Sequence, residues 1–225
     1  MNIEQARFNM IEQQIRPWHV SDTTVLGLLS TVKREDFVPA AHKGLAFADL
    51  EIPLMGSGEE AIRLGQCMLE PRLDARMLQD LAVRPTDTIL EIGSGSGYTA
   101  ALLASMAQRV ITLEINAELA ILARSNLRNA GIHNVEVRQA DGAKMSTADG
   151  NFDVIAMSGS ITEVPLGLLN LLKLGGRLGA VVGDEPIMHA TVVTRTGDSS
   201  FSTVTGWETL APRLLNFPEP SRFKL

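Results

Sequence analysis

The sequence predicts an α/β protein with a doubly wound, mostly parallel sheet, helices on both faces, an antiparallel edge strand and an N-terminal helical extension. Three observations support this fold class. Apolar strand-length segments alternate with helical patterns after Pro85, which is typical of parallel sheets with crossover helices. A glycine-rich turn follows the first of these strands. The chain of 225 residues is long enough to bury a full core as one compact unit.

Residues 1–75 are predicted to form the helical and loop-rich extension. Apolar residues recur at helical spacing between Glu4 and Thr31, and Pro17 divides this pattern into two helices. Ser21-Asp22 is a suitable N-cap for the second helix. Prolines and glycines interrupt the chain from Asp36 to about Pro71, which predicts loops.

Residues 76–225 are predicted to form the main domain. A helix predicted from Pro71 to about Val83 spans the start of this domain. The predicted strands are Thr88–Ile92, Arg109–Leu113, Val135–Arg138, Val154–Met157 and Arg177–Val182. The predicted helices between them are Tyr98–Ala107, Asn116–Ala130 and Val164–Leu172. Two β-branched runs, Ala190–Thr194 and Phe201–Thr205, flank Gly197 and predict a hairpin at the sheet edge.

The composition is that of an ordinary globular protein, with 45% apolar and 20% charged residues. The net charge is -6 and the basic residues form no run, so we expect no nucleic-acid partner. Cys67 is the single cysteine, which excludes an intrachain disulfide. No apolar segment approaches the ~20 residues of a membrane span, and the first residues lack a signal-peptide pattern. We therefore expect a cytoplasmic protein without membrane association.

The strongest chemical signal is the segment from Leu90 to Tyr98, in which Gly93, Gly95 and Gly97 follow an apolar strand and open a helix. Glycines at such a turn allow tight bending and close approach of a ligand to the backbone. In doubly wound sheets these turns lie at the carboxyl ends of the strands, where ligands bind. A tight strand–helix turn without a ligand is the simpler alternative.

Two common nucleotide motifs do not fit this turn. A dinucleotide fingerprint starting at Gly93 requires glycine where Tyr98 stands, and no Gly-Lys-Ser/Thr follows for a phosphate loop. The remaining pattern, an acidic residue, an apolar residue and G-x-G-x-G, resembles the first motif of class I methyltransferases. That resemblance implies a Rossmann-like domain with S-adenosyl-L-methionine as cofactor. The residues it places in the cofactor site are Glu91, Gly93, Ser94, Gly95, Gly97 and Tyr98.

The next two strands end in polar residues that suit the rest of a nucleoside. Glu114 ends the second strand, where a carboxylate accepts hydrogen bonds from both ribose hydroxyls in nucleotide-binding sheets. Asp141 and Gly142 follow the third strand and resemble the methyltransferase segment that meets adenine. Each residue alone is compatible with a solvated helix start or turn. Together, three features at the ends of three successive strands favour a cofactor site.

Further segments resemble the protein-L-isoaspartate O-methyltransferase family. The similarity covers roughly residues 5–56 and 85–185, and its N-terminal pieces are the specific ones. The segments are Asn9–Arg16, Val32–Pro39, Ala46–Asp49, Phe152–Ile155 and Leu174–Leu178. This resemblance implies carboxyl methylation of L-isoaspartyl residues, with a damaged protein or peptide as the partner.

The chain departs from the family in the loop that faces methyl donor and substrate. The family carries Thr-Ile-Ser-Gln-Pro there, whereas this chain reads Cys67-Met68-Leu69-Glu70-Pro71. Leu69 offers no side-chain hydrogen bond, so the acceptor is expected to be held differently. After the fourth strand, Ser158 and Ser160 supply hydroxyls where the family has threonine and alanines.

Methylation of a carboxylate needs no general base, because a carboxyl group with a pKa near ~4 is ionised at pH 7. No catalytic residue is therefore assigned, and the four scattered histidines predict no metal site. Three alternatives remain: a methyltransferase with another acceptor, a cofactor-binding module without turnover, and a nicotinamide dehydrogenase, which Tyr98 opposes. The sequence leaves the acceptor and the oligomeric state open.

Overall fold

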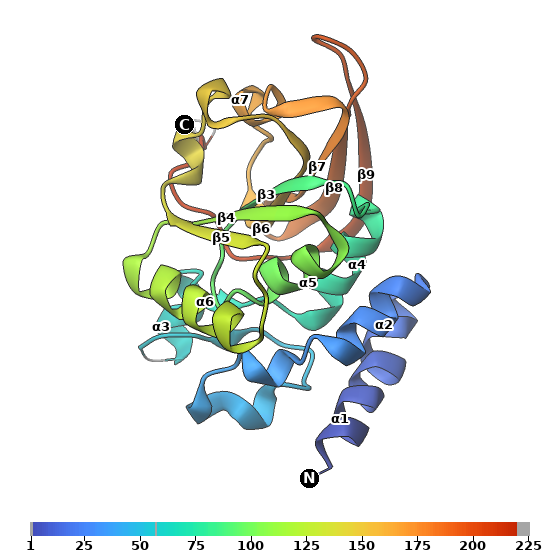
Figure 1. The fold of residues 1–225 in the computed structure, drawn as a ribbon, viewed down its shortest axis with the longest axis vertical. Helices are drawn as coiled ribbons and strands as arrows, with labels where there is room; N and C mark the ends of the chain where they lie inside the picture. The colour runs from blue at the N-terminus through green and yellow to red at the C-terminus, as the bar shows by residue number, and fades with distance from the viewer. Residues whose placement is uncertain (1, 57, 220–225) are drawn as a thin grey trace.

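The computed structural model describes residues 2–56 and 58–219. Its centre is a seven-stranded sheet with the order β5-β4-β3-β6-β7-β8-β9. The strands are β3 (Thr88–Ile92), β4 (Arg109–Glu114), β5 (Val135–Gln139), β6 (Phe152–Ile161), β7 (Leu172–Asp184), β8 (Ile187–Arg195) and β9 (Phe201–Thr209). The first five run parallel, and β8 and β9 form an antiparallel hairpin at one edge (Figure 1). The predicted fold class, the five parallel strands and the hairpin are confirmed.

One predicted helix is wrong over half its length. The helix expected at Val164–Leu172 is a single turn, α7 (Leu166–Leu169), and Leu172 already begins β7. Leu172 is fully buried and pairs with Phe152 at the start of β6. A short apolar run fits a buried strand as well as a buried helix, and here pairing with β6 decides for the strand.

The two faces of the sheet are covered unequally. Helices α4 (Pro71–Leu81), α5 (Tyr98–Met106) and α6 (Ala117–Asn129) pack on one face, and α7 lies on the other (Figure 1). Side chains alternate along the strands, so Ile89 packs with the three long helices while Leu90 faces α7. The face with α7 is otherwise covered by irregular segments.

The N-terminal extension packs on the same face as the three long helices. It contains α1 (Ile3–Met10), a π-helical turn, a short 3-10 turn that includes Pro17, and α2 (Thr23–Thr31). Asp22 caps α2 by accepting hydrogen bonds from the amides of Thr24 and Val25, so the predicted cap and the division at Pro17 are confirmed.

Tertiary contacts join this extension to the main domain. Met10, Ile15 and Leu29 are fully buried in one core cluster with side chains of α4 and α5. Helix α4 runs through the boundary predicted between residues 75 and 76, and the division into two domains stays a prediction.

The loop-rich segment between Asp36 and Pro71 contains short elements of its own. Strands β1 (Ile52–Pro53) and β2 (Cys67–Met68) pair antiparallel on either side of α3 (Gly58–Arg63). Ile52 pairs with Met68 and Pro53 with Cys67. This small ladder holds the Cys67–Glu70 loop in place ahead of α4.

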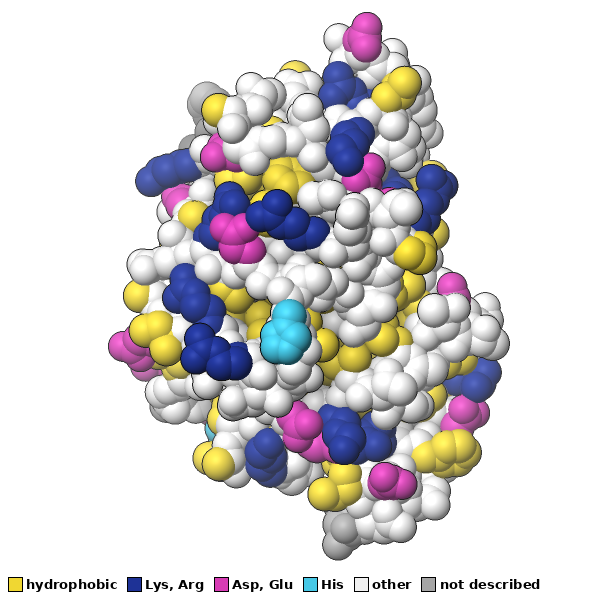
Figure 2. All heavy atoms as spheres, viewed as in Figure 1, with side chains coloured by type: hydrophobic (Ala, Val, Ile, Leu, Met, Phe, Trp, Pro, Cys, Tyr) yellow, Lys and Arg dark blue, Asp and Glu magenta, His cyan; other side chains and the backbone are white. Residues whose placement is uncertain are grey.

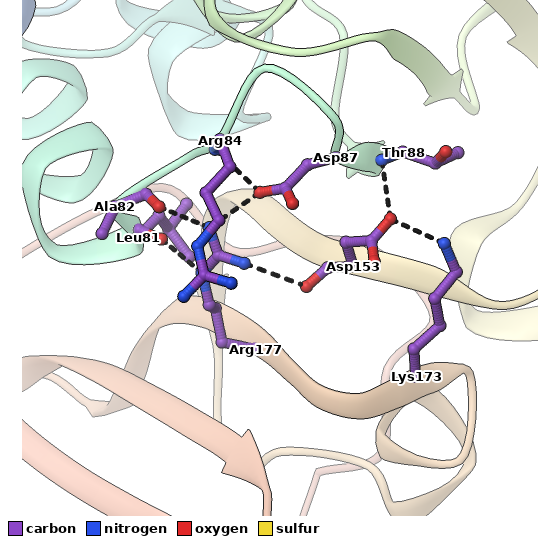
Figure 3. A network of polar contacts seen from close by, with 8 residues as sticks. All are labelled: Leu81, Ala82, Arg84, Asp87, Thr88, Asp153, Lys173 and Arg177. Carbon is purple, nitrogen blue, oxygen red and sulfur yellow. Dashed lines mark hydrogen bonds and ion pairs between the residues drawn. The ribbon is translucent and has the colours of Figure 1, made fainter.

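The amino ends of three parallel strands are joined by a polar network (Figure 3). Arg177 of β7 donates to the carbonyl of Ala82, to that of Leu81 and, at 2.8 Å, to Asp87 Oδ2. Asp153 of β6 accepts from the amide of Thr88 and from Lys173. Asp87 is buried and the side chain of Arg177 is 12% exposed, so this network fixes the end of α4 to the sheet.

On the face seen in Figure 2, basic and acidic side chains are interspersed, and hydrophobic side chains show between the N-terminal helices and the helices of the main domain. Within residues 2–56 and 58–219, no helix has the length and apolar character needed to cross a bilayer.

Candidate active site

A cavity of about 310 Å³ opens at the carboxyl ends of β3, β4 and β5. Five of the nine residues predicted for the cofactor site line it: Gly93, Gly95, Glu114, Asp141 and Gly142. Since carboxyl ends of neighbouring parallel strands meet at one edge of a sheet, the sheet order β5-β4-β3 brings these sequence-distant residues together. The volume lies at the low end of the range for small-molecule sites.

The glycine turn requires glycine for two separate reasons. Gly93, Gly95 and Gly97 have φ values of 98°, 51° and 85°, in the left-handed region. A Cβ on Gly93 would also lie 3.1 Å from the carbonyl oxygen of Ser158, at the floor of the cavity. A Cβ on Gly97 would instead lie 3.2 Å from the carbonyl oxygen of Ala123 in α6. Gly97 thus sets the packing of α6, while Gly93 borders the cavity.

Glu114 links the glycine turn to the end of β4. Its Oε2 accepts from the amide of Gly95 at 2.9 Å, and its Oε1 accepts from the amide of Asn116 at 3.0 Å. A carboxylate has about four acceptor sites, so each oxygen retains one. Because Glu114 lines the cavity, these remaining sites are available to a diol.

Asp141 is held by two donors at the far side of the cavity. Its Oδ1 accepts from the amide of Ala143, and its Oδ2 accepts from the side-chain amide of Asn216 at 3.0 Å. Burial alone would raise the pKa of Asp141, but these hydrogen bonds and nearby Lys144 lower it overall. The carboxylate therefore remains ionised and can accept a further hydrogen bond.

Glu91 lies beneath the turn rather than at the cavity surface. It is fully buried, and its Oε1 accepts from the hydroxyl of Ser158 at 2.8 Å. Burial raises the pKa of Glu91 to about 8. Ser158 itself lines the cavity, so Glu91 influences the site through this serine.

Ser94 and Tyr98 border a second cavity of about 20 Å³ between the glycine turn and the Cys67–Glu70 loop. Ser94 and Thr112 hydrogen-bond through their hydroxyls at 2.6 Å. Tyr98 is 2% exposed, and its ring packs edge-on against Phe37 at 5.5 Å between centroids. Four of the predicted site residues do not line the main cavity and instead support the glycine turn: Glu91, Ser94, Gly97 and Tyr98.

The Cys67–Glu70 loop contributes Cys67 to the wall of the main cavity and Cys67, Met68 and Leu69 to the wall of the small one. Arg34, which is fully buried, donates from Nη2 to the carbonyl of Leu69 at 2.8 Å and lies 5.3 Å from the centre of the Tyr98 ring. Burial and the charge of Glu51 raise the pKa of the Cys67 thiol to about 12. Cys67 is therefore a neutral thiol in the cavity wall rather than a thiolate nucleophile.

The sequence reasoning missed the C-terminal part of the wall. Arg213, Leu214, Leu215 and Phe217 line the cavity, and the side chain of Leu214 comes near Gly93. This segment is held by Ser160, whose amide donates to Pro212 and whose carbonyl accepts from Leu214. No motif marks the segment, because its position depends on backbone pairing between residues about fifty positions apart.

The cavity lies on a doubly wound sheet and is bordered by a glycine turn, a strand-end glutamate and an Asp-Gly pair. This arrangement is that of a Rossmann-like, S-adenosylmethionine-dependent methyltransferase. Residues 5–210 match the family model of protein-L-isoaspartate(D-aspartate) O-methyltransferase. The chain belongs to that family, and the resemblance read from the sequence is confirmed.

Individual relatives agree with this assignment. A protein-L-isoaspartate O-methyltransferase from Koribacter versatilis is 38% identical over 84% of this chain and 81% of its own length. One from Methanoculleus marisnigri is 37% identical over 80% of this chain and 78% of its own length. A structure of a Plasmodium falciparum protein of this kind, in complex with S-adenosyl-L-homocysteine, superposes with a TM-score of 0.77 at 18% identity. The match covers 95% of this chain and 98% of that one, and it supports the fold.

Proposed function

We propose that this enzyme transfers a methyl group from S-adenosyl-L-methionine to the free carboxylate of L-isoaspartyl residues in damaged proteins or peptides. The observation that carries the cofactor half is Glu114, whose carboxylate lines the cavity with one acceptor site left on each oxygen. Family membership over residues 5–210 carries the acceptor half. The single cysteine, a buried free thiol, supports the cytoplasm as the compartment.

The cavity residues fit the three parts of this cofactor. Gly93 and Gly95 leave room for the amino-acid portion next to the backbone. Glu114 would accept hydrogen bonds from the ribose hydroxyls, and Asp141 would accept one from the adenine amine. The apolar side chains of Ile115, Leu215 and Phe217, which line the cavity, would cover the adenine ring.

When bound, the cofactor supplies an electrophilic methyl group on a sulfonium. The protein's contribution is to position the acceptor carboxylate, which is ionised at neutral pH, and to exclude water. No side chain has to remove a proton. Leu214 of the C-terminal segment and Cys67 of the Cys67–Glu70 loop both line the cavity, so these two segments would orient the acceptor.

A second candidate is a methyltransferase of the same class with a different acceptor. Leu69 favours a different acceptor, because it stands where the family carries a hydroxyl. The side chain of Leu69 is apolar, and its backbone carbonyl is already bonded to Arg34. Ser158 is the hydroxyl that borders both cavities. Its proton is donated to Glu91, so its oxygen would accept a hydrogen bond from a backbone amide of the acceptor in either case.

The deciding experiment uses methyl-labelled S-adenosyl-L-methionine with an isoaspartyl peptide and its normal aspartyl twin. Base-labile label on the isoaspartyl peptide alone is the expected result. Label on neither peptide, with cofactor binding shown by calorimetry, would refute the isoaspartyl assignment and leave the second candidate. A Glu114→Gln variant should lose cofactor affinity, which tests the cofactor half without any acceptor.

A further inference from the structure

A separate cleft of about 470 Å³ lies beside the candidate active site. Trp18, Ile187 and Leu210 contribute apolar side chains to its lining, and Glu51, Glu70 and Glu208 contribute carboxylates. The cleft is therefore amphipathic. Clefts of this kind suit a side chain that has both an apolar stem and a charged end.

The cleft meets the active site at the Cys67–Glu70 loop. Ile52 pairs with Met68 at one end of the β1–β2 ladder, and Glu51 and Leu69 are the residues that directly flank this pair in the chain. The charge of Glu51 contributes to the raised pKa of Cys67, and Cys67 lines the cofactor cavity. Glu51 thus lines the cleft and is near Cys67, which lines the cavity.

Arg72, a cation in the cleft wall, is already engaged by other groups. Its guanidinium lies 3.0 Å from Asp49 Oδ2 and 2.6 Å from Glu70 Oε2, and it stacks over the Trp18 ring at 4.3 Å. Two carboxylates therefore compensate its single charge. The stacking also fixes the orientation of the Trp18 ring at the cleft.

The carboxylates of Glu51 and Glu208 remain without a close cation. Across residues 2–56 and 58–219, Glu51 receives no hydrogen bond or ion pair, and burial together with the charge of Glu70 raises its pKa. Glu208 is an exposed side chain whose nearest partner is His189, 3.9 Å away. The cleft thus offers two uncompensated negative groups next to apolar surface.

We propose that this cleft binds a lysine or arginine side chain adjacent to the isoaspartyl residue of the substrate polypeptide. The aliphatic stem packs against Trp18, Ile187 and Leu210, and the charged end lies toward Glu51 and Glu208. This inference rests on the proposed function and adds a preference for basic flanking sequence. An acidic flanking residue would place like charges together, which disfavours binding.

The test uses isoaspartyl peptides that differ at one position, with lysine, glutamine or glutamate placed in turn at each of the two positions on either side. Wild type is expected to show, at one flank, a KM about ten-fold lower for lysine than for glutamate, a difference that shrinks at high salt. Glu51→Gln combined with Glu208→Gln should bring the two KM values within about two-fold. Glu208→Lys should reduce or reverse the preference.

The matched control is Asp198→Asn, which removes a negative charge at the opposite end of the β8–β9 hairpin and should leave the preference unchanged. Thermal melting checks that each variant is folded. Equal KM values for lysine and glutamate peptides at all four positions would overturn the inference while the isoaspartyl activity stands. A preference that survives the double variant would also overturn it. No methylation of any peptide, with cofactor bound, would refute the proposed function as well.

Discussion

The hydroxyl of Ser158 donates a hydrogen bond of 2.8 Å to Oε1 of Glu91, which ties β6 to β3 directly beneath the glycine turn. Oε2 of Glu91 has no hydrogen-bond partner in the part of the chain that the structure describes. Burial raises the pKa of this carboxyl to about 8, so the group is largely neutral at pH 7. A neutral carboxyl avoids the cost of a buried unpaired charge.

The first prediction concerns stability and pH. The pKa of Glu91 is raised in the folded state from 4.5 to about 8, so its stabilising contribution is present below pH 4.5 and is lost as the pH rises through 8. This group should lower the free energy of unfolding by up to ~1.4 kcal/mol per pH unit in that window. The Glu91→Gln variant should lack this part of the pH dependence of the free energy of unfolding.

Urea denaturation at pH 5, 6.5 and 8 measures the effect. Asp74, whose pKa burial raises to about 6, adds a slope below pH 6 that both proteins share. The free energy of unfolding of the variant, relative to wild type, should therefore increase with pH. Parallel pH profiles for the two proteins would contradict the protonated state assigned to Glu91.

The second prediction concerns the buried ion pair of Arg177 and Asp87. Arg177→Met should lower the free energy of unfolding by about 3–5 kcal/mol, because the buried Asp87 carboxylate would lose its cation and keep the amide of Arg84 as a donor. Lys173→Met removes a half-exposed partner of Asp153 and should cost at most ~1 kcal/mol. Chemical denaturation measures both. The network lies at the amino ends of the strands, so folded Arg177→Met protein should keep the cofactor affinity of wild type.

The third prediction separates two glycines of the turn. Gly93→Ala and Gly97→Ala should each cost about 1–2 kcal/mol of stability, since both residues have left-handed φ values. Only Gly93 lines the cofactor cavity, so Gly93→Ala should weaken cofactor binding far more than Gly97→Ala does. Calorimetric titration with S-adenosyl-L-homocysteine distinguishes them. Equal losses of affinity would show that the shape of the whole turn matters more than the lining residue.

The fourth prediction concerns Asn216, whose side chain bonds Asp141 at 3.0 Å and thereby fixes the C-terminal segment over the cavity. Asn216→Ala should weaken cofactor binding about five-fold, the equivalent of one ordinary hydrogen bond of ~1 kcal/mol. The weaker binding should arise from faster dissociation of the cofactor, which stopped flow measures. Asn129→Ala, an exposed substitution at the end of α6, serves as control. An unchanged dissociation rate would mean that the segment does not retain the cofactor.

Local patterns in the sequence determined most of the fold. Strand–helix alternation predicted β3 at Thr88–Ile92, and the cap at Asp22 and the helix start at Pro71 follow from chemistry within one turn of chain. Glu114 was identified as a carboxylate at the end of a strand, and Asp141 by its resemblance to the methyltransferase segment that meets adenine. Each of these signals lies within a short stretch of the sequence.

Tertiary structure alone decided the remainder. Whether Leu172 joined a helix or a strand depended on pairing with Phe152, and Tyr98 turned toward Phe37 because the N-terminal extension covers α5. The position of Leu214 at the cavity rests on backbone bonds to Ser160. Such contacts join segments far apart in the chain, and no local periodicity encodes them. The sequence by itself therefore determined the sheet and the class of cofactor site, while the walls that face the acceptor were set by packing between distant segments.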